Sequence, residues 1–153
     1  MPAEGVTPLF WGMRRAFTLP ELMLVLAVAG VLLGFAIPRL SSALDRVEVQ
    51  AAASHIAAAH QRARLMALTR AQVLVLSVAP AELTIRRRGE TVPLWSFPGP
   101  ETSRVALAGP SRQFVFSPEG LTQGLSNATL RLTRGAATRT VVVSRLGRIR
   151  ITR

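Results

Sequence analysis

Few side chains in this 153-residue sequence have the type and spacing that catalysis or metal binding requires. The chain has no cysteine, which excludes disulfides, thiolate metal sites and a cysteine nucleophile. Its two histidines, His55 and His60, are five residues apart, about 140° around a helix, so they cannot hold one metal ion together. We expect both on a helix surface. Since no nucleophile–base set or glycine-rich phosphate loop is recognisable, the sequence predicts no enzyme, no cofactor and no metal.

Two arginines near the C-terminus are the side chains best suited to bind a ligand. Arg148 and Arg150 alternate with Ile149 and Ile151, so a strand would place both guanidinium groups on one face and both isoleucines on the other. Guanidinium groups bind phosphate bidentately. The pattern fits a phosphate-binding strand, and it also fits an edge strand whose solvated charges resist aggregation. Three further arginines at 86–88 are expected in a solvated hairpin turn.

The composition combines a strong positive charge with a high apolar content. All 19 basic residues are arginine, and eight acidic residues leave a net charge of +11. Taken alone, this charge suggests a nucleic-acid binder. However, 49% of the residues are hydrophobic, too many for a disordered basic tail. The length suits one domain with a modest core.

Residues 22–37 form an uncharged apolar run, LMLVLAVAGVLLGFAI. A helix from Phe17 to Ile37 would be about 31 Å long, close to the bilayer core of about 30 Å. Helices of soluble cores are normally amphipathic, whereas this run is apolar all round. We therefore expect a membrane span over residues 17–38. The positive-inside rule leaves Arg14 and Arg15 in the cytoplasm and the bulk of the chain outside.

A secretory signal peptide is the alternative interpretation, because it also combines a basic start with an apolar stretch. A signal peptide should end with a small-x-small cleavage site, whereas here Pro38 and Arg39 follow the apolar run and a helical pattern continues. Glu21 also lies inside the apolar stretch, where a carboxylate without a partner is costly. An acidic residue at that depth indicates a function, which makes Glu21 a candidate functional residue.

The segment at the start of the apolar stretch reads RRAFTLPEL over residues 14–22. It resembles the class III signal of type IV pilins and type II secretion pseudopilins. The resemblance implies that a prepilin peptidase cleaves between Ala16 and Phe17 and that Phe17 becomes an N-methylated terminus. It also implies that Glu21, at the fifth mature position, pairs with a neighbouring subunit's terminal amine. An ammonium partner would neutralise the carboxylate in lipid.

The expected leader, residues 1–16, departs from the family in two respects. The family usually has glycine where this chain has Ala16, so we expect slower processing. Residues 1–12 contain no basic residue, whereas a start at Met13 would leave a short basic leader. We therefore hypothesise that Met13 is the true start.

Beyond the apolar run, the spacing of the apolar residues predicts an amphipathic helix over residues 39–71. Pro38 removes a backbone hydrogen bond and should bend the helix in the stretch 30–38. We expect the helix to end near residues 69–71. The residues at helical spacing are Leu40, Leu44, Val47, Ala51, Ala58 and Leu65.

Residues 72–153 read as short strands separated by turns, which predicts an antiparallel sheet or β-sandwich head and an α+β fold. We expect Leu94, Trp95 and Phe97 in the core of this head. The predicted strands are 73–78, 83–87, 92–97, 104–107, 113–117, 129–133, 138–144 and 148–152.

The head also resembles a family. FVFSPEG at 114–120 and GRIRI at 147–151 are similar to the GspH/FimT-like pseudopilin head. The resemblance implies a minor pilin or minor pseudopilin, anchored once in the bacterial inner membrane with the head outside the cytoplasm. It would then enter a type IV pilus or a type II secretion pseudopilus. Its expected partners are other filament subunits, the prepilin peptidase and membrane lipid.

The same resemblance leaves a second function open. In FimT-like members a C-terminal Gly-Arg-x-Arg segment is associated with DNA binding during uptake, and residues 147–150 match it. The alternative to a purely structural subunit is therefore a DNA-binding minor pilin in competence, with Arg148 and Arg150 as phosphate contacts. Similar segments also occur in secretion-type members.

Overall fold

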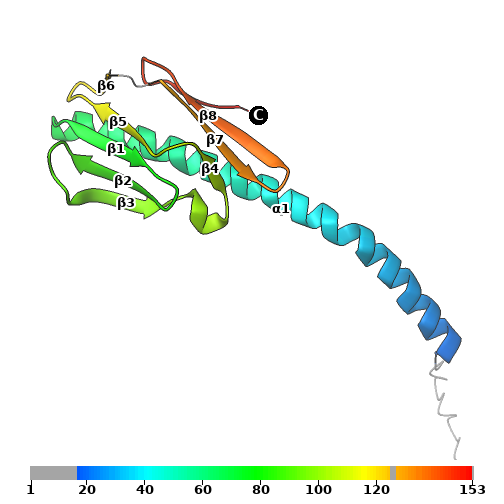
Figure 1. The fold of residues 1–153 in the computed structure, drawn as a ribbon. Helices are drawn as coiled ribbons and strands as arrows, with labels where there is room; N and C mark the ends of the chain where they lie inside the picture. Colours follow the sequence, from blue (N-terminus) through cyan, green and yellow to red (C-terminus); the bar gives the residue numbers. More distant parts are fainter. Residues whose placement is uncertain (1–16, 125–126, 153) are drawn as a thin grey trace, which may run out of the picture. The chain divides into compact units, whose positions relative to one another are not determined.

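The computed structural model describes residues 17–124 and 127–152 (Figure 1). It divides into two units, residues 1–38 and 39–153. The expected leader, residues 1–16 with Ala16, and the start at Met13 lie outside the described residues.

A single helix, α1 (Leu19–Arg70), contributes to both units. Thr18 caps its start, because the Thr18 hydroxyl accepts a hydrogen bond from the Glu21 N–H at 3.4 Å. Pro20 is tolerated in the first turn, where its missing N–H costs no intrahelical bond. The helix continues without interruption through residues 30–38, the stretch in which we expected Pro38 to bend it.

The predicted end of α1 is confirmed. Ala71 has a positive φ of 48°, the left-handed conformation that ends many helices. The Ala71 N–H donates to the Leu68 carbonyl at 3.3 Å, and the Gln72 N–H donates to the Ala67 carbonyl at 3.2 Å. These two bonds close the last turn and redirect the chain into the head.

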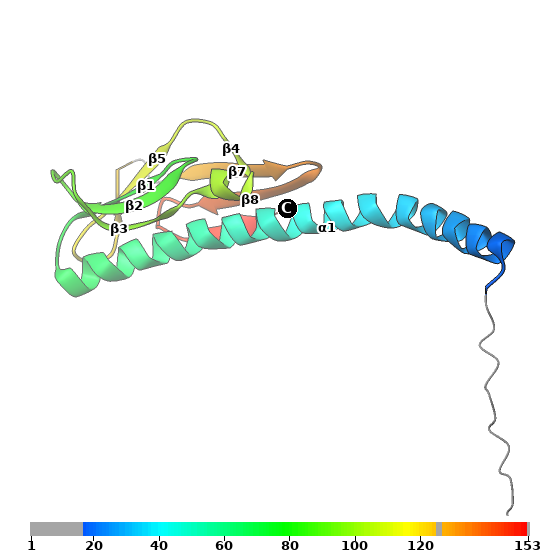
Figure 2. The same cartoon turned by 90° about the horizontal axis from the view of Figure 1, so that it is seen from below.

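The head is built of antiparallel strands, as predicted, and they form two sheets, the sandwich alternative of the prediction. The five-stranded sheet has the order β3-β2-β1-β5-β6, and the four-stranded sheet has the order β4-β7-β8-β9. Their strands are β1 (Leu74–Val78), β2 (Glu82–Arg87), β3 (Pro93–Pro98), β4 (Ala106–Ala108), β5 (Arg112–Phe116), β6 (Thr122–Gln123), β7 (Ala128–Arg134), β8 (Ala137–Val143) and β9 (Ile149–Thr152). Figure 2 shows both sheets on one side of the second half of α1.

Each of the eight predicted strands overlaps an observed one. The strand expected over 104–107 begins only at Ala106, because a 3-10 helix, η1 (Pro100–Ser103), and a left-handed Arg104 at φ 55° precede it. β6 was not predicted, since a strand of two residues leaves no alternation to recognise.

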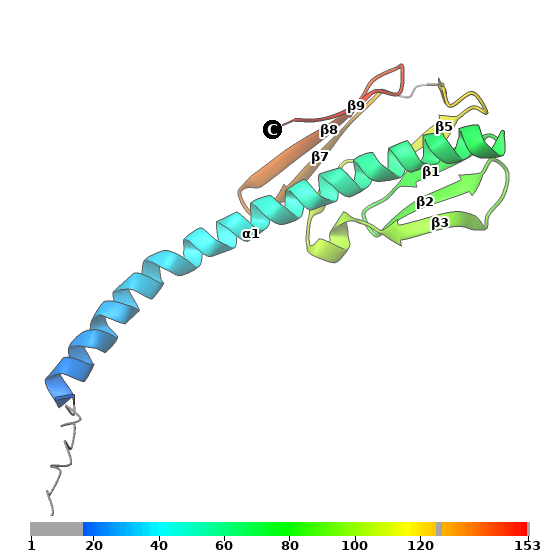
Figure 3. The same ribbon diagram turned by 180° about the vertical axis from the view of Figure 1, so that it is seen from behind.

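The face of α1 that packs on the head differs from the predicted one. The packed face is made mainly of small side chains, which let the sheets approach the helix. Figure 3 shows the backbone of the second half of α1 running along both sheets. In contrast, Leu40, Val47 and Leu65 of the predicted stripe remain 63%, 64% and 60% exposed. The buried apolar residues of this face are Val49, Ala52, Ala53, Ile56, Ala59, Ala63 and Ala67.

Candidate functional site: anchor helix and basic sheet face

The first half of α1 presents its apolar side chains in all directions. From Phe17 to Ile37, every large apolar side chain is more than half exposed. Within the described residues, α1 is the one helix long and apolar enough to cross a membrane, and its most apolar window is not buried at all. The core helix of a soluble protein normally hides one face, which this segment does not. Such a surface requires lipid or other apolar helices around it.

Glu21 is the only charged side chain between Phe17 and Ile37. It lies exposed in the first turn of α1, where its negative charge interacts favourably with the helix dipole. Phe17 precedes the helix and is 76% exposed. Only three residues thus separate Phe17 from a carboxylate that would have no water around it in an apolar environment.

The alternation predicted at the C-terminus is confirmed. Arg148 and Arg150 are exposed, while Ile149 and Ile151 pack against the core. β9 lies at the edge of the four-stranded sheet and pairs with β8, where Arg150 stands opposite Val142.

A tight turn positions the first of these arginines. The Ser144 N–H donates to the Arg148 carbonyl at 2.8 Å, and the Arg148 N–H donates to Ser144 Oγ at 3.1 Å. Gly147 has a φ of 72°, a conformation that glycine adopts without strain. The turn therefore holds Arg148 just before the strand that carries Arg150.

A third arginine shares this outer face of the four-stranded sheet. Arg131 on β7 is exposed and stands opposite Thr140 on β8, which in turn stands opposite Thr152 on β9. Residues in register share a face, and Thr152 is two residues from Arg150, so Arg131 and Arg150 point the same way. No acidic residue occurs after Glu119 in the sequence. We call this surface, with Arg131, Arg148 and Arg150, the basic sheet face.

Two nearby arginines do not belong to the basic sheet face. The Arg134 guanidinium pairs with Asp45 on α1 at 2.9 Å and donates to the Ser103 carbonyl at 2.7 Å. The Arg139 guanidinium donates to Gln50 on α1 at 2.8 Å. Both arginines therefore hold the β7–β8 hairpin against α1 through side-chain contacts. Gly135 has a φ of 54°, which favours glycine in this hairpin, and a Cβ there would lie 2.5 Å from the Asp45 carboxylate and displace it.

The prediction that both histidines lie on the helix surface is wrong for His60, which is 1% exposed. The His60 ring packs edge-on against Phe114 and Phe116, with centroids 5.8 and 5.0 Å away, and neither ring nitrogen has a hydrogen-bond partner. Burial, with the nearby Arg64 charge, lowers the pKa of His60 to about 4. His55 is exposed as predicted, and the described residues contain no group of metal-ligating side chains.

The aromatic residues of β3 are only half inside the core. Trp95 and Phe97 are partly buried and stack with their ring centroids 5.9 Å apart, while Leu94 is 37% exposed. The expectation that all three belong to the core was therefore wrong for Leu94. The solvated turn expected at 86–88 is confirmed only for Arg88, because Arg86 and Arg87 belong to β2 and Arg86 is half-buried. The Arg87–Glu90 pair beside the turn, at 2.8 Å, is 47% and 44% exposed.

Comparison with known proteins identifies the family. The pattern of the family described as Type II transport protein GspH matches residues 52–147, and the prokaryotic N-terminal methylation motif matches residues 11–37. Pilin-like protein PilA1 of Thermus thermophilus is 37% identical over 155 residues, spanning 90% of this chain and 98% of that protein.

Solved structures show the same fold. Two crystal forms of the type IV minor pilin FimU of Pseudomonas aeruginosa match with TM-scores of 0.58 and 0.53. Their sequences are 20% and 18% identical to this chain. The matches span 71% and 68% of this chain and 91% and 92% of the FimU chains. The methylation motif, the apolar helix and the two-sheet head agree: the chain belongs to the GspH family of type IV pilin-like minor pilins and pseudopilins.

Proposed function

We propose that this protein is a structural minor pilin, cleaved between Ala16 and Phe17, methylated at Phe17 and assembled through α1 into a filament. The observation that carries the proposal is the first half of α1, apolar on every side with one carboxylate in its first turn. Before assembly, this segment anchors the chain in the inner membrane with the head outside the cytoplasm. The methylation motif over residues 11–37 supports this processing.

Glu21 is proposed to set the register of assembly. A cleaved Phe17 carries a terminal ammonium, which can pair with the Glu21 carboxylate of a neighbouring subunit. In an apolar environment this pairing is strong, and either charge left alone is costly. The ion pair would therefore select one stagger between adjacent helices.

We favour a type IV pilus over a type II secretion pseudopilus as the assembly. The choice is supported by the relative that is 37% identical to this chain, because it is a pilin-like protein and the match spans nearly its whole length. The secretion pseudopilus remains the alternative, supported by the description of the matching family. Deleting the gene should abolish or shorten surface pili and leave protein secretion intact; the opposite pattern would assign the chain to secretion.

Mass spectrometry of subunits from sheared filaments tests the processing directly. The account predicts an N-terminal peptide that begins at Phe17 with one added methyl group. Peptides that begin after Ile37 would indicate a cleaved signal peptide and contradict the proposal.

A second candidate function, DNA binding in uptake, is supported by the basic sheet face. Arg131, Arg148 and Arg150 lie exposed on one acid-free surface, a suitable arrangement for contacts with a phosphate backbone. In a gel shift with the full chain in detergent, Arg148→Gln/Arg150→Gln should weaken DNA binding by about tenfold or more at low salt. The matched control Arg86→Gln/Arg88→Gln removes the same charge elsewhere and should have little effect. Equal binding by both double variants would reject the site.

A further inference from the structure

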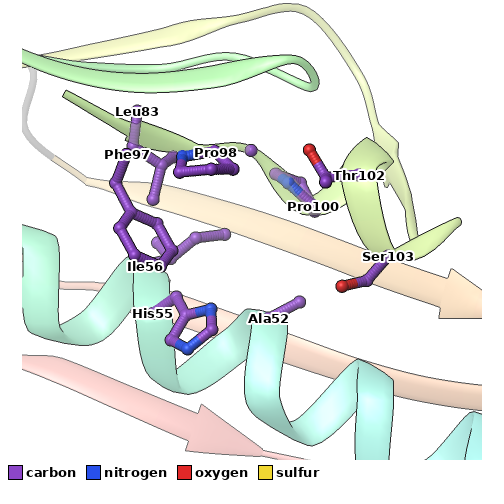
Figure 4. A pocket seen from close by; sticks show the side chains of 10 residues that line it. Ala52, His55, Ile56, Leu83, Phe97, Pro98, Pro100, Thr102 and Ser103 are labelled. Carbon is purple, nitrogen blue, oxygen red and sulfur yellow. The ribbon is translucent and has the colours of Figure 1, made fainter.

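A groove of about 630 Å³ separates the second half of α1 from β3. The rings of Trp95 and Phe97 form its β3 wall, and Ala58, Leu65 and Met66 line the helix side. We call this the α1–β3 groove. A smaller hollow of about 130 Å³ lies next to it, where the His55 ring meets the Phe97 ring edge-on at 4.9 Å (Figure 4).

The groove holds the kinds of side chain that dominate protein–protein contacts. The Arg62 guanidinium lies 5.2 Å from the centre of the Trp95 ring, and Leu65 beside it is 60% exposed. Tryptophan and arginine are enriched among residues that contribute most to binding at interfaces. In the described part of the chain no carboxylate pairs with Arg62, and no acidic residue lines the groove. A partner can therefore supply both the apolar surface and the counter-charge.

The edge of β3 indicates how a partner would bind. β3 is an edge strand of its sheet, but it begins at Pro93 and ends at Pro98, and these prolines limit the pairing of a further strand. Binding through backbone strand addition is thus disfavoured. A partner would instead bind by inserting its own side chains into the α1–β3 groove, between Trp95 and α1.

The position of the groove points to a subunit of the same filament. Ala58 and Leu65 belong both to the groove and to the exposed apolar stripe of α1 that begins at Leu40. If this stripe packs on neighbouring subunits along the helix, the same neighbours also lie beside the groove. Residues 39–153 contain 17 arginines and six acidic residues, so a second copy would be repelled and an acidic partner attracted.

We propose that the α1–β3 groove binds a neighbouring filament subunit of different, acidic sequence, which inserts an apolar side chain beside Trp95 and pairs a carboxylate with Arg62. This inference rests on the proposed function, because only filament assembly brings such a neighbour to the groove.

Site-specific photocrosslinking in cells tests it on the full chain. Benzoylphenylalanine replaces Leu65 or, as a second position in the groove, Thr69, which is also exposed. Ultraviolet light should then link the chain to another filament subunit, identified by mass spectrometry through its own N-terminal methylation motif. The same probe at Leu146, 81% exposed in the β8–β9 turn, should not form this product.

A charge reversal tests the role of Arg62. Arg62→Glu should lower the yield of the crosslink by about tenfold or more, because it places like charges together. Arg112→Glu, the same change at an exposed position outside the groove, should leave the yield unchanged.

Three results would overturn the inference. The first is a chain found in filaments without a groove crosslink, which leaves the proposed function intact. The second is a crosslink to a second copy of this chain or to a protein outside the filament. The third is absence of the wild-type chain from filaments, which rejects the proposed function as well.

Discussion

The two halves of α1 use apolar side chains in opposite ways. Between Phe17 and Ile37 the large side chains are all exposed, whereas between Val49 and Ala67 mostly small ones are buried against the sheets. The second half is therefore stabilised by the protein's own head, and the first half must be stabilised by its surroundings. One helix can thus serve both as a core element and as an assembly surface.

The largest expected effect concerns the buried His60. Its folded pKa, about 4, lies below the unfolded value of 6.5, so the unfolded chain binds the proton more tightly. His60 should not change the free energy of unfolding above pH 6.5. As the pH drops from 6.5 to 4, its titration should lower the free energy of unfolding by roughly 3 kcal/mol in total. His60→Phe should remove this part of the pH dependence, measured by chemical unfolding of the full chain in detergent. An unchanged pH profile in the variant would show that His60 is not the cause.

Overpacking the buried face of α1 should have the next largest effect. Ala53 is fully buried, and Ala53→Leu should lower the free energy of unfolding by about 2 kcal/mol. Ala43→Leu, the same change at an exposed position of the helix, should alter it by less than about 0.5 kcal/mol. Equal effects at both positions would mean that the sheets do not pack on this face.

The ion pair between Asp45 and Arg134 should contribute less. Both side chains are 25% exposed, and Asp45→Asn should destabilise the head by about 1 kcal/mol, since the pair is only partly shielded from water. Glu90→Gln, which removes the more exposed pair with Arg87, is the matched control and should cost less than about 0.5 kcal/mol. Thermal unfolding of the two variants compares the pairs; a larger loss from Glu90→Gln would contradict this ranking.

The smallest effect is expected in the first half of α1. Leu32 is 64% exposed, so Leu32→Ala should change the unfolding free energy of the head by less than about 0.5 kcal/mol. A decrease in the free energy of unfolding as large as that of Ala53→Leu would contradict the claim that the head stabilises only the second half of α1.

Local pattern was sufficient to predict the apolar first half of α1, the end of α1, the antiparallel head and the outward alternation at Arg148 and Arg150. These features depend on neighbours in the chain, through periodicity and turn residues. The packed face of α1 could not be predicted in this way. Its alanines are no more apolar than the exposed leucines, and only contact with the sheets distinguishes them.

The remaining errors have the same origin. The burial of His60 depends on rings in β5, more than 50 residues later. The α1–β3 groove likewise exists only where two distant segments meet. Such features require the tertiary arrangement, which short-range patterns in one sequence do not specify.

The most direct test of the central claim, that the first half of α1 is an assembly surface organised by Glu21, is filament incorporation. The fraction of mature subunit in sheared filaments is measured for wild type, Glu21→Ala and Glu21→Asp. The account predicts near-complete loss for Glu21→Ala, with membrane levels and N-terminal processing unchanged, and partial recovery for Glu21→Asp, which keeps the carboxylate. Normal incorporation of Glu21→Ala would contradict it.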